Sequence, residues 1–303
     1  MQTRRQFLQQ TSAAAALAAL PFPSRAASTG ISLGFSLYGM KTVPLDEALR
    51  VCAEIGYRNV EFTLNPGFPT EPKLLSADAR KNLRSRLTSL RLDLSALMLN
   101  MSLAADDAAH AKNLDTLKAA AQLAHDLAPK QPPVVETVLG GKPPEWDNVK
   151  DRMAERLQSW AAVGVAGKIT LAIKAHVGSA VNSPERLLWL LEKANSPAVK
   201  AAYDYSHFQL AGIPLADSLK ALLPQTRFIH LKDATGDVKK FQFLLPGEGS
   251  TDYAAYFKLL KQFSYSGPVV VEVSGQIFNK PDYDPIAAAK KCFAVLSAAL
   301  ERA

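Results

Sequence analysis

The sequence lacks the features that identify membrane, nucleic-acid-binding and multidomain proteins. Its early apolar run, residues 13–20 of the 303-residue chain, is too short to span a bilayer as a mature helix. No arginine-rich run is interleaved with aromatic side chains, so the usual electrostatic footprint of a nucleic-acid partner is missing. No low-complexity linker divides the chain. We therefore expect one domain that binds no nucleic acid and, once mature, no membrane.

The first residues have the order of an export signal. Arg4 and Arg5 are followed by Phe7, then by the mild apolar run, and small residues permit cleavage near Ala26. The paired arginines resemble the twin-arginine type of signal. An amphipathic surface helix is the alternative, but the segment is alanine-rich and has no acidic residue. We expect a twin-arginine signal peptide at residues 1–26.

Removal of that segment defines the mature protein. Residues 27–303 are expected to form a single barrel domain, exported folded to the periplasm or secreted. The formal net charge falls from +7 to +4, because three arginines belong to the signal. The remaining charge is too modest and scattered to indicate a polyanionic partner.

Cysteine is scarce, with Cys52 and Cys292 alone. They fall in the first and last predicted helices, which become neighbours if the fold closes on itself. A disulfide is conceivable in an oxidising periplasm. Twin-arginine cargo folds in a reducing compartment before export, however, so two buried free thiols are favoured.

Apolar segments alternate with amphipathic ones along the mature chain. Strands are expected at residues 31–38, 57–63, 92–101, 134–139, 169–176, 199–204, 227–232 and 268–273. Helices are expected at residues 44–55, 76–90, 106–127, 147–163, 184–194, 215–223, 252–263 and 284–300. Strand starts recur about every 34 residues, which suits a β-loop-α-loop unit, so the predicted fold is α/β, a single (β/α)8 TIM barrel. A doubly wound sheet would need a glycine-rich phosphate turn after the first strand, and residues 34–39 do not supply one.

Polar side chains stand at the ends of three successive late strands. Asp204 ends an apolar strand and precedes His207, His230 shares a strand face with Lys232, and Glu272 interrupts a run of valines. A barrel brings the carboxyl ends of its strands together, where active sites lie. An ionised carboxylate among valines is costly unless a cation neutralises it. Because the donors are oxygen and nitrogen, Mn, Mg, Co or Zn would suit them.

These motifs resemble those of a known family. The matching segments are Tyr203-Asp204-x-x-His207, Ile229-His230-Leu231-Lys232-Asp233, Leu245-Pro246-Gly247-Glu248-Gly249 and Gly267-Pro268-Val269-Val270-Val271-Glu272-Val273. Their order is similar to that of the xylose-isomerase-like barrels of the sugar phosphate isomerase/epimerase superfamily. The resemblance implies a divalent metal held by Asp204, His230 and Glu272, with His207 and Lys232 beside it.

Strand five departs from the family pattern. Where the family usually has Glu-x-His, this chain has Lys174-Ala175-His176, so one carboxylate ligand, which is also a base in ketose epimerases, is missing. The segment is more similar to the His-x-His-x-Gly of inosose dehydratases. His176 is expected to complete the metal site. Glu136 on strand four is either a ligand, a substrate-binding group or the ion-pair partner of Lys174.

The predicted roles follow from this arrangement. Lys174, Glu272 and His207 are the candidate catalytic residues, and Lys232, His207 and Glu136 are the candidate substrate-binding residues. Lys174 would act as a neutral base if a nearby dication lowers its pKa, as an oxyanion clamp if protonated, or merely as a substitute for the metal's charge.

The predicted function is a sugar or keto-sugar isomerase or epimerase that abstracts a proton next to a carbonyl, with a divalent metal assisting. A lyase or dehydratase acting on a keto-sugar, an inosose or an oxidised glycoside is the alternative. From another class, a non-catalytic sugar-binding barrel remains open. A repair endonuclease of this superfamily needs a multi-metal cluster, for which five histidines are too few. The partner is a small carbohydrate, and a homo-oligomer is compatible with the sequence.

Overall fold

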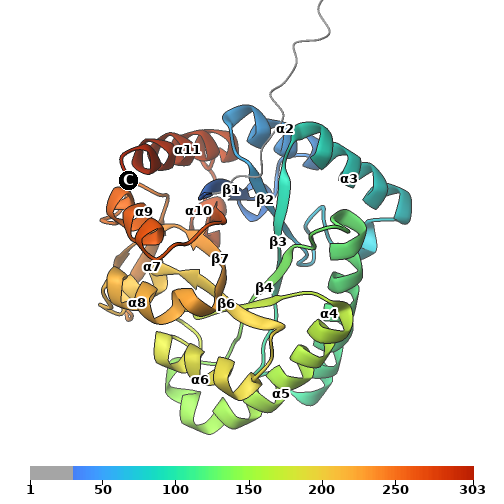
Figure 1. Cartoon of the computed structure of the whole chain (residues 1–303), viewed down its shortest axis with the longest axis vertical. Coiled ribbons are helices and arrows are strands. Elements are labelled where there is room, and N and C mark those ends of the chain that lie inside the picture. Colours follow the sequence, from blue (N-terminus) through green and yellow to red (C-terminus); the bar gives the residue numbers. More distant parts are fainter. Residues whose placement is uncertain (1–29) are drawn as a thin grey trace, which may run out of the picture.

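The computed structural model describes residues 30–303 (Figure 1). The predicted signal peptide, residues 1–26, lies outside the described residues. In the part of the chain that is described, no helix combines the length and apolarity needed to cross a bilayer.

Parallel strands close into a barrel at the centre of the molecule (Figure 1). Its strands are β1 (Ser32–Ser36), β2 (Asn59–Thr63), β3 (Asp93–Asn100), β4 (Val134–Val138), β5 (Leu171–Lys174), β6 (Val199–Asp204), β7 (Thr226–Leu231) and β10 (Pro268–Val271). Each pairs with the next along the chain, and β1 also pairs with β10 through Leu33 opposite Val269. This closure confirms the predicted TIM barrel and is incompatible with an open doubly wound sheet.

Helices surround the strands as a ring (Figure 1). They are α2 (Leu45–Ile55), α3 (Ala77–Leu90), α4 (Asp107–Leu127), α5 (Trp146–Gly167), α6 (Pro184–Ala194), α8 (Leu215–Leu222), α9 (Tyr253–Gln262) and α11 (Pro285–Glu301). Several begin at a residue whose side-chain oxygen accepts a first-turn N–H, as Ser76, Asp106, Ser183, Asp252 and Asp284 do. The sequence therefore fixes the helix starts locally.

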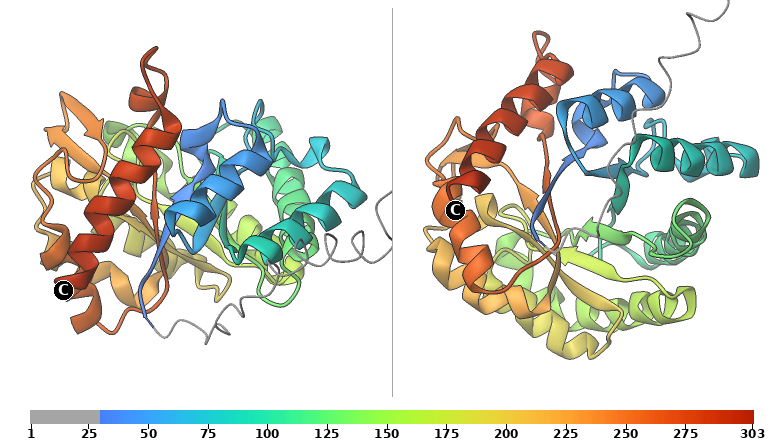
Figure 2. Two further views of the ribbon diagram at one scale, coloured as in Figure 1. Left: turned by 90° about the horizontal axis from the view of Figure 1, so that it is seen from above. Right: turned by 45° about the horizontal axis from the view of Figure 1, so that its top comes forward.

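The structure adds short elements that were not predicted. They are the helices α7 (Tyr205–Leu210) and α10 (Gly275–Phe278), the 3₁₀ turns η1 (Leu37–Met40), η2 (Pro72–Leu74), η3 (Pro143–Glu145) and η4 (Leu223–Gln225), and a hairpin of β8 (Asp233–Gly236) and β9 (Phe241–Leu244). In the left view of Figure 2 the orange hairpin lies at the upper left, above the chain's C-terminus at the lower left. The Asp237 side chain stabilises its turn by accepting from the Lys239 and Lys240 amides.

The prediction for strand five was too long at its C-terminal end. β5 stops at Lys174, and His176 lies in the following turn, where its amide donates to Val181 and its carbonyl accepts from Ser179. His176 therefore lies outside β5, although it was expected to share one strand face with Lys174.

The barrel interior changes character along its length. One layer consists of the apolar residues Ala96, Ala172, Ala202, Phe228 and Val270. The small side chains leave room for the single phenylalanine ring, as in the packed interior of a TIM barrel. Two residues further along four of these strands are Lys174, Asp204, His230 and Glu272, so an ionic cluster lies next to this apolar layer.

Both cysteines are buried and free, as predicted. Burial raises the pKa of the Cys52 thiol to about 12, and burial together with Glu248 does the same for Cys292. Both thiols therefore stay protonated at neutral pH.

Candidate active site

A cluster of ionisable side chains fills the carboxyl end of the barrel. Its members come from six strands or the residues that directly follow them, and they are Glu61, Glu136, Lys174, Asp204, His230, Lys232 and Glu272. All but Glu272 are buried, and the Glu272 side chain is 11% exposed. The cluster therefore meets solvent mainly at one carboxylate.

Lys174 lies at the centre of one half of the cluster. Its Nζ is 2.9 Å from His230 Nδ1, 3.0 Å from Glu272 Oε2 and 3.2 Å from Glu136 Oε1. Burial by itself would lower the pKa of Lys174, but Glu136 and Glu272 outweigh it and raise that pKa above its ordinary value. Lys174 is therefore an ammonium ion at neutral pH. Of the alternatives for Glu136, the structure shows the ion pair with Lys174, and a role in binding substrate stays a prediction.

Lys232 holds the other half together. Its Nζ donates to Asp204 Oδ2 at 2.5 Å and to Glu272 Oε2 at 2.7 Å. It also lies 4.8 Å from the centre of the Phe243 ring on β9, within cation–π range. Both lysines thus donate to the same oxygen of Glu272.

His230 bridges two carboxylates. Its Nε2 is 2.9 Å from Glu61 Oε2, and its Nδ1 is 3.2 Å from Glu272 Oε2. Burial lowers the pKa of His230, but Glu61 and Glu272 overcome this effect, so that the pKa rises to about 9. The imidazolium form donates from both nitrogens, and the neutral form accepts from Lys174 at Nδ1. Neither form leaves a free lone pair.

The two histidines beside the cluster, His176 and His207, are neutral. Burial, followed by Lys232, lowers the pKa of His207 to about 4. Its Nε2 lies 3.3 Å from Asp204 Oδ2, and its Nδ1 accepts from the Val177 amide at 3.4 Å. Burial, followed by His207, lowers the pKa of His176 to about 2. The His176 and His207 ring centres are 4.2 Å apart, so the two rings form one wall of the site.

Opposing effects set the charge of the carboxylates. Burial raises the pKa of Asp204 and of Glu272, but the nearby lysines prevail and hold both pKa values well below the usual range. For Glu136 burial prevails over Lys174, and its pKa is raised. Asp204 also caps α7, because Oδ1 accepts from the Ser206 amide and hydroxyl. Its capping role and its place in the cluster therefore coexist.

Three of the four predicted metal ligands lie together. Asp204, His230 and Glu272 can each bring one ligand atom within 4.8 Å of the others, an arrangement whose donor types are consistent with a divalent metal. His176 lies outside this group, and its Nδ1 accepts from the Gly178 amide at 3.0 Å. Its role as a fourth ligand stays a prediction.

The same ligand atoms are already engaged by nitrogen donors. Lys232 donates to Asp204, both lysines donate to Glu272, and Lys174 faces His230 Nδ1. A metal ion at these atoms would have to displace the two ammonium groups. The residues as arranged suit the two ammonium groups of Lys174 and Lys232. They do not fit a divalent metal ion in addition.

Aromatic rings pack around Tyr38, whose pKa is raised by burial and by Glu272. Tyr38 stacks on Phe68 at 5.5 Å between ring centres and meets the edge of Phe278 at 4.7 Å. Tyr38 and Phe278 are both half-buried. Such partly exposed rings can pack against the C–H faces of a small polar ligand.

Sequence reasoning missed Glu61 and Phe243. Glu61 lies between the apolar residues Val60 and Phe62, as Glu272 lies between two valines, and this signal could have identified it. Phe243 belongs to the hairpin, and its ring centre is 5.2 Å from that of His207. Phe243 covers the cluster through an element whose existence the sequence did not reveal.

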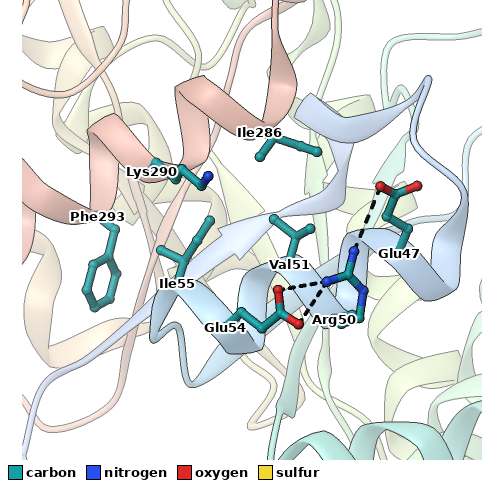
Figure 3. Close-up of a pocket in the computed structure, with 8 residues that line it drawn as sticks. All are labelled: Glu47, Arg50, Val51, Glu54, Ile55, Ile286, Lys290 and Phe293. Carbon is teal, nitrogen blue, oxygen red and sulfur yellow. Dashed lines mark hydrogen bonds and ion pairs between the residues drawn. The ribbon is translucent and has the colours of Figure 1, made fainter.

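A groove on the outside of the barrel is separate from this cluster. It lies between α2 and α11 and is lined by Glu47, Arg50, Val51, Glu54, Ile55, Ile286, Lys290 and Phe293 (Figure 3). Arg50 pairs there with Glu54 at 2.8 Å. None of the lining residues belongs to the ionic cluster, and the groove contains no arrangement of catalytic groups.

Comparison with known sequences identifies relatives over most of the chain. A family model described as xylose isomerase-like TIM barrel matches residues 49–296. Inosose dehydratase of Geobacillus kaustophilus (strain HTA426) is 22% identical over 258 residues, covering 75% of this chain and 79% of that protein. L-ribulose-5-phosphate 3-epimerase of Salmonella typhi is 24% identical over 248 residues, covering 78% of this chain and 84% of that protein.

Solved structures share the fold. The IolI protein with a bound zinc atom superimposes with a TM-score of 0.73 at 20% identity, covering 88% of this chain and 98% of that one. A xylose isomerase-like TIM barrel protein from Mycobacterium smegmatis in complex with magnesium gives a TM-score of 0.65 at 18% identity, covering 89% and 97%. These similarities support the fold. The chemistry has to be inferred from the residues of this chain.

Proposed function

Because this chain belongs to the xylose isomerase-like TIM barrel family, we propose that it is an enzyme that isomerises or epimerises a sugar or keto-sugar. The relatives named as an epimerase and a dehydratase support a reaction on a small carbohydrate. The observation that carries the proposal is the junction of Lys174, Lys232 and Glu272. A carboxylate and two cations meet there at the one part of the cluster that reaches solvent.

The chemistry needs a base and a stabiliser of negative charge. Glu272 takes the proton from the carbon next to the substrate carbonyl. The C–H electron pair forms a carbon–carbon double bond, and the π pair of the carbonyl moves onto the carbonyl oxygen. Lys174 and Lys232 donate hydrogen bonds to that oxygen, which is where charge develops. Return of the proton from Glu272 to the former carbonyl carbon, while the neighbouring hydroxyl proton passes to the former carbonyl oxygen, gives an isomer. Protonation of the opposite face of the same carbon by Lys174, which the proton on Glu272 then restores, gives an epimer.

Substrate binding itself would make Glu272 a better base. Without substrate, Glu272 Oε2 receives hydrogen bonds from both lysines, and these hold its pKa low. A carbonyl oxygen that accepts one of these N–H groups reduces the donation to Glu272. Its pKa then rises toward the value that proton transfer at neutral pH requires.

The residues around this junction would position the sugar. His207 is held by Asp204 and the Val177 amide, so a neutral imidazole faces the site. The half-buried Tyr38 and Phe278 rings offer an apolar surface to the substrate. None of these steps uses a metal.

Dehydration is the second candidate, and Lys174 favours it. A second carboxylate base is absent where Lys174 stands, and an ammonium group can instead protonate a departing hydroxyl. Loss of that hydroxyl from the enolate then yields water and an unsaturated ketone. The relative named inosose dehydratase is consistent with this outcome.

We expect the protein to exchange a substrate C–H proton for deuterium. Either outcome begins with enolisation, so exchange should precede or accompany product formation with a keto-sugar, an aldose or an inosose in deuterated water. Proton NMR on a sugar panel measures it, and reactions without enzyme are the control. Product identity then separates isomerisation from dehydration. Saturable binding without exchange would contradict the proposal and favour a sugar-binding protein.

We also propose export by the twin-arginine route. Replacing Arg4 and Arg5 together by lysine should retain the protein in the cytoplasm. Twin-arginine receptors recognise the geometry of the guanidinium pair and not merely its charge. Cell fractionation measures the distribution, and Arg25→Lys is the matched control that should export normally. Unchanged export of the double variant would assign the signal to the general secretory type.

A further inference from the structure

We propose that the Lys174 ammonium, assisted by Lys232, takes the place of a metal ion in this barrel, so that the resting protein holds no divalent metal and its chemistry proceeds without one. The part of this proposal that concerns catalysis without a metal rests on the proposed function. The part that concerns metal binding does not, and metal analysis tests it alone.

The position of Lys174 is the first argument. Its Nζ is within 3.2 Å of one atom each from Glu136, His230 and Glu272, on three different strands or their ends. The His230 ring is fixed from behind, since Nε2 contacts Glu61 Oε2 at 2.9 Å. A carboxylate that orients the far nitrogen of a histidine is the arrangement that supports a metal-binding histidine. Here the near nitrogen faces an ammonium group.

The lack of space for both cations is the second argument. A metal bound to Glu272 Oε2 at its usual bond length would lie within about 5 Å of both lysine nitrogens, which donate to the same oxygen. Lys174 has little freedom to leave, because its side chain is 3% exposed and its backbone belongs to β5. A dication would therefore have to displace, or bind beside, an ammonium group that its strand holds in place.

The contacts of the carboxyl groups are the third argument. One oxygen of each of the four carboxyl groups, Glu61, Glu136, Asp204 and Glu272, lies within 3.2 Å of a nitrogen of Lys174, Lys232 or His230. The oxygens that would attract a dication are thus already engaged by groups built into the chain. Because the Lys174 and Lys232 ammonium groups are fixed, they also need no reorganisation when an enolate oxygen forms beside them.

The wild-type protein provides the decisive measurement. Elemental analysis of the mature chain after dialysis should find Mn, Zn, Co and Mg each far below one ion per chain. Titration calorimetry with MnCl₂ and ZnCl₂ should give no tight site. One retained ion per chain that a chelator removes would overturn the proposal, with no variant needed.

A charge reversal at the same position should create the site that wild type lacks. Lys174→Glu supplies a carboxylate where the ammonium stood, and divalent metal should bind at least about tenfold more tightly than to wild type. Lys258→Glu is the matched control, since Lys258 is exposed on α9, and it should bind as wild type does. Circular dichroism confirms folding. If folded Lys174→Glu gains no metal affinity, Lys174 does not occupy the ion's place.

Activity completes the test. Deuterium exchange by wild type should be unchanged by a chelator and by added metals. Loss of exchange on chelation, restored by metal, would overturn the metal-free proposal while leaving the proposed function intact. Absence of exchange under all conditions would instead defeat the proposed function, and the metal measurements would still decide the role of Lys174.

Discussion

Lys174→Met is expected to cost roughly 3–5 kcal/mol of unfolding free energy, because it leaves buried carboxylates without their cation. Glu136 and Glu272 lie 3.2 and 3.0 Å from the lost ammonium group, and the Glu136 side chain is 1% exposed. Protonation of Glu136 relieves part of this cost, since burial already raises the pKa of Glu136. Denaturant unfolding followed by circular dichroism measures the change.

The same variant should lose turnover by on the order of 10²-fold or more, because no ammonium group faces the developing oxyanion. The double variant Lys174→Met/Glu136→Gln separates the two effects. Removing the stranded carboxylate should recover part of the stability but none of the activity. Full turnover by a folded Lys174→Met protein would end the catalytic role of Lys174 and leave it as a charge partner only.

The barrel was predictable because its signals are local and repeated. All eight barrel strands and their surrounding helices form where apolar runs and cap residues indicated them. β10 is an example, since Pro268 to Val271 is apolar on both faces, as a strand covered by helices must be. Once eight such units follow one another, closure leaves few alternatives.

The hairpin was not predictable in the same way. β8 and β9 are four residues each, and their stability depends on packing with residues distant in sequence. Phe243 and Ala234 form a small apolar cluster with Val177 and Leu210, from the turn after β5 and from α7. No pattern within residues 233–244 reveals those neighbours. A covering element that depends on tertiary contacts can therefore be identified only from the structure.

The candidate site was predictable where a polar residue breaks an apolar run. Asp204, His230 and Glu272 were found in this way, and they lie together. The identity of their partner was not predictable, because it depends on where the long Lys174 and Lys232 side chains end. A lysine on a strand predicts a charge near the barrel mouth, and only the coordinates place its nitrogen between particular ligand atoms.

Glu272→Gln is expected to have the largest effect on catalysis. The amide cannot accept the substrate proton, and it cannot balance the two ammonium groups that donate to Glu272 Oε2. We expect kcat to fall by about 10³-fold, within the usual range for loss of a general base. Stability should fall by roughly 3 kcal/mol, because buried cations lose their shared partner.

The control is Glu54→Gln on α2, which removes an exposed carboxylate paired with Arg50. Surface pairs of this kind contribute about 0–1 kcal/mol, so the control should match wild type in turnover and nearly in stability. Deuterium exchange distinguishes two roles of Glu272. If it is the base, exchange and product formation fall together. If it only positions Lys174 and Lys232, exchange survives with weakened substrate binding, and the base must be sought at His176 or His207, the neutral imidazoles of the same wall.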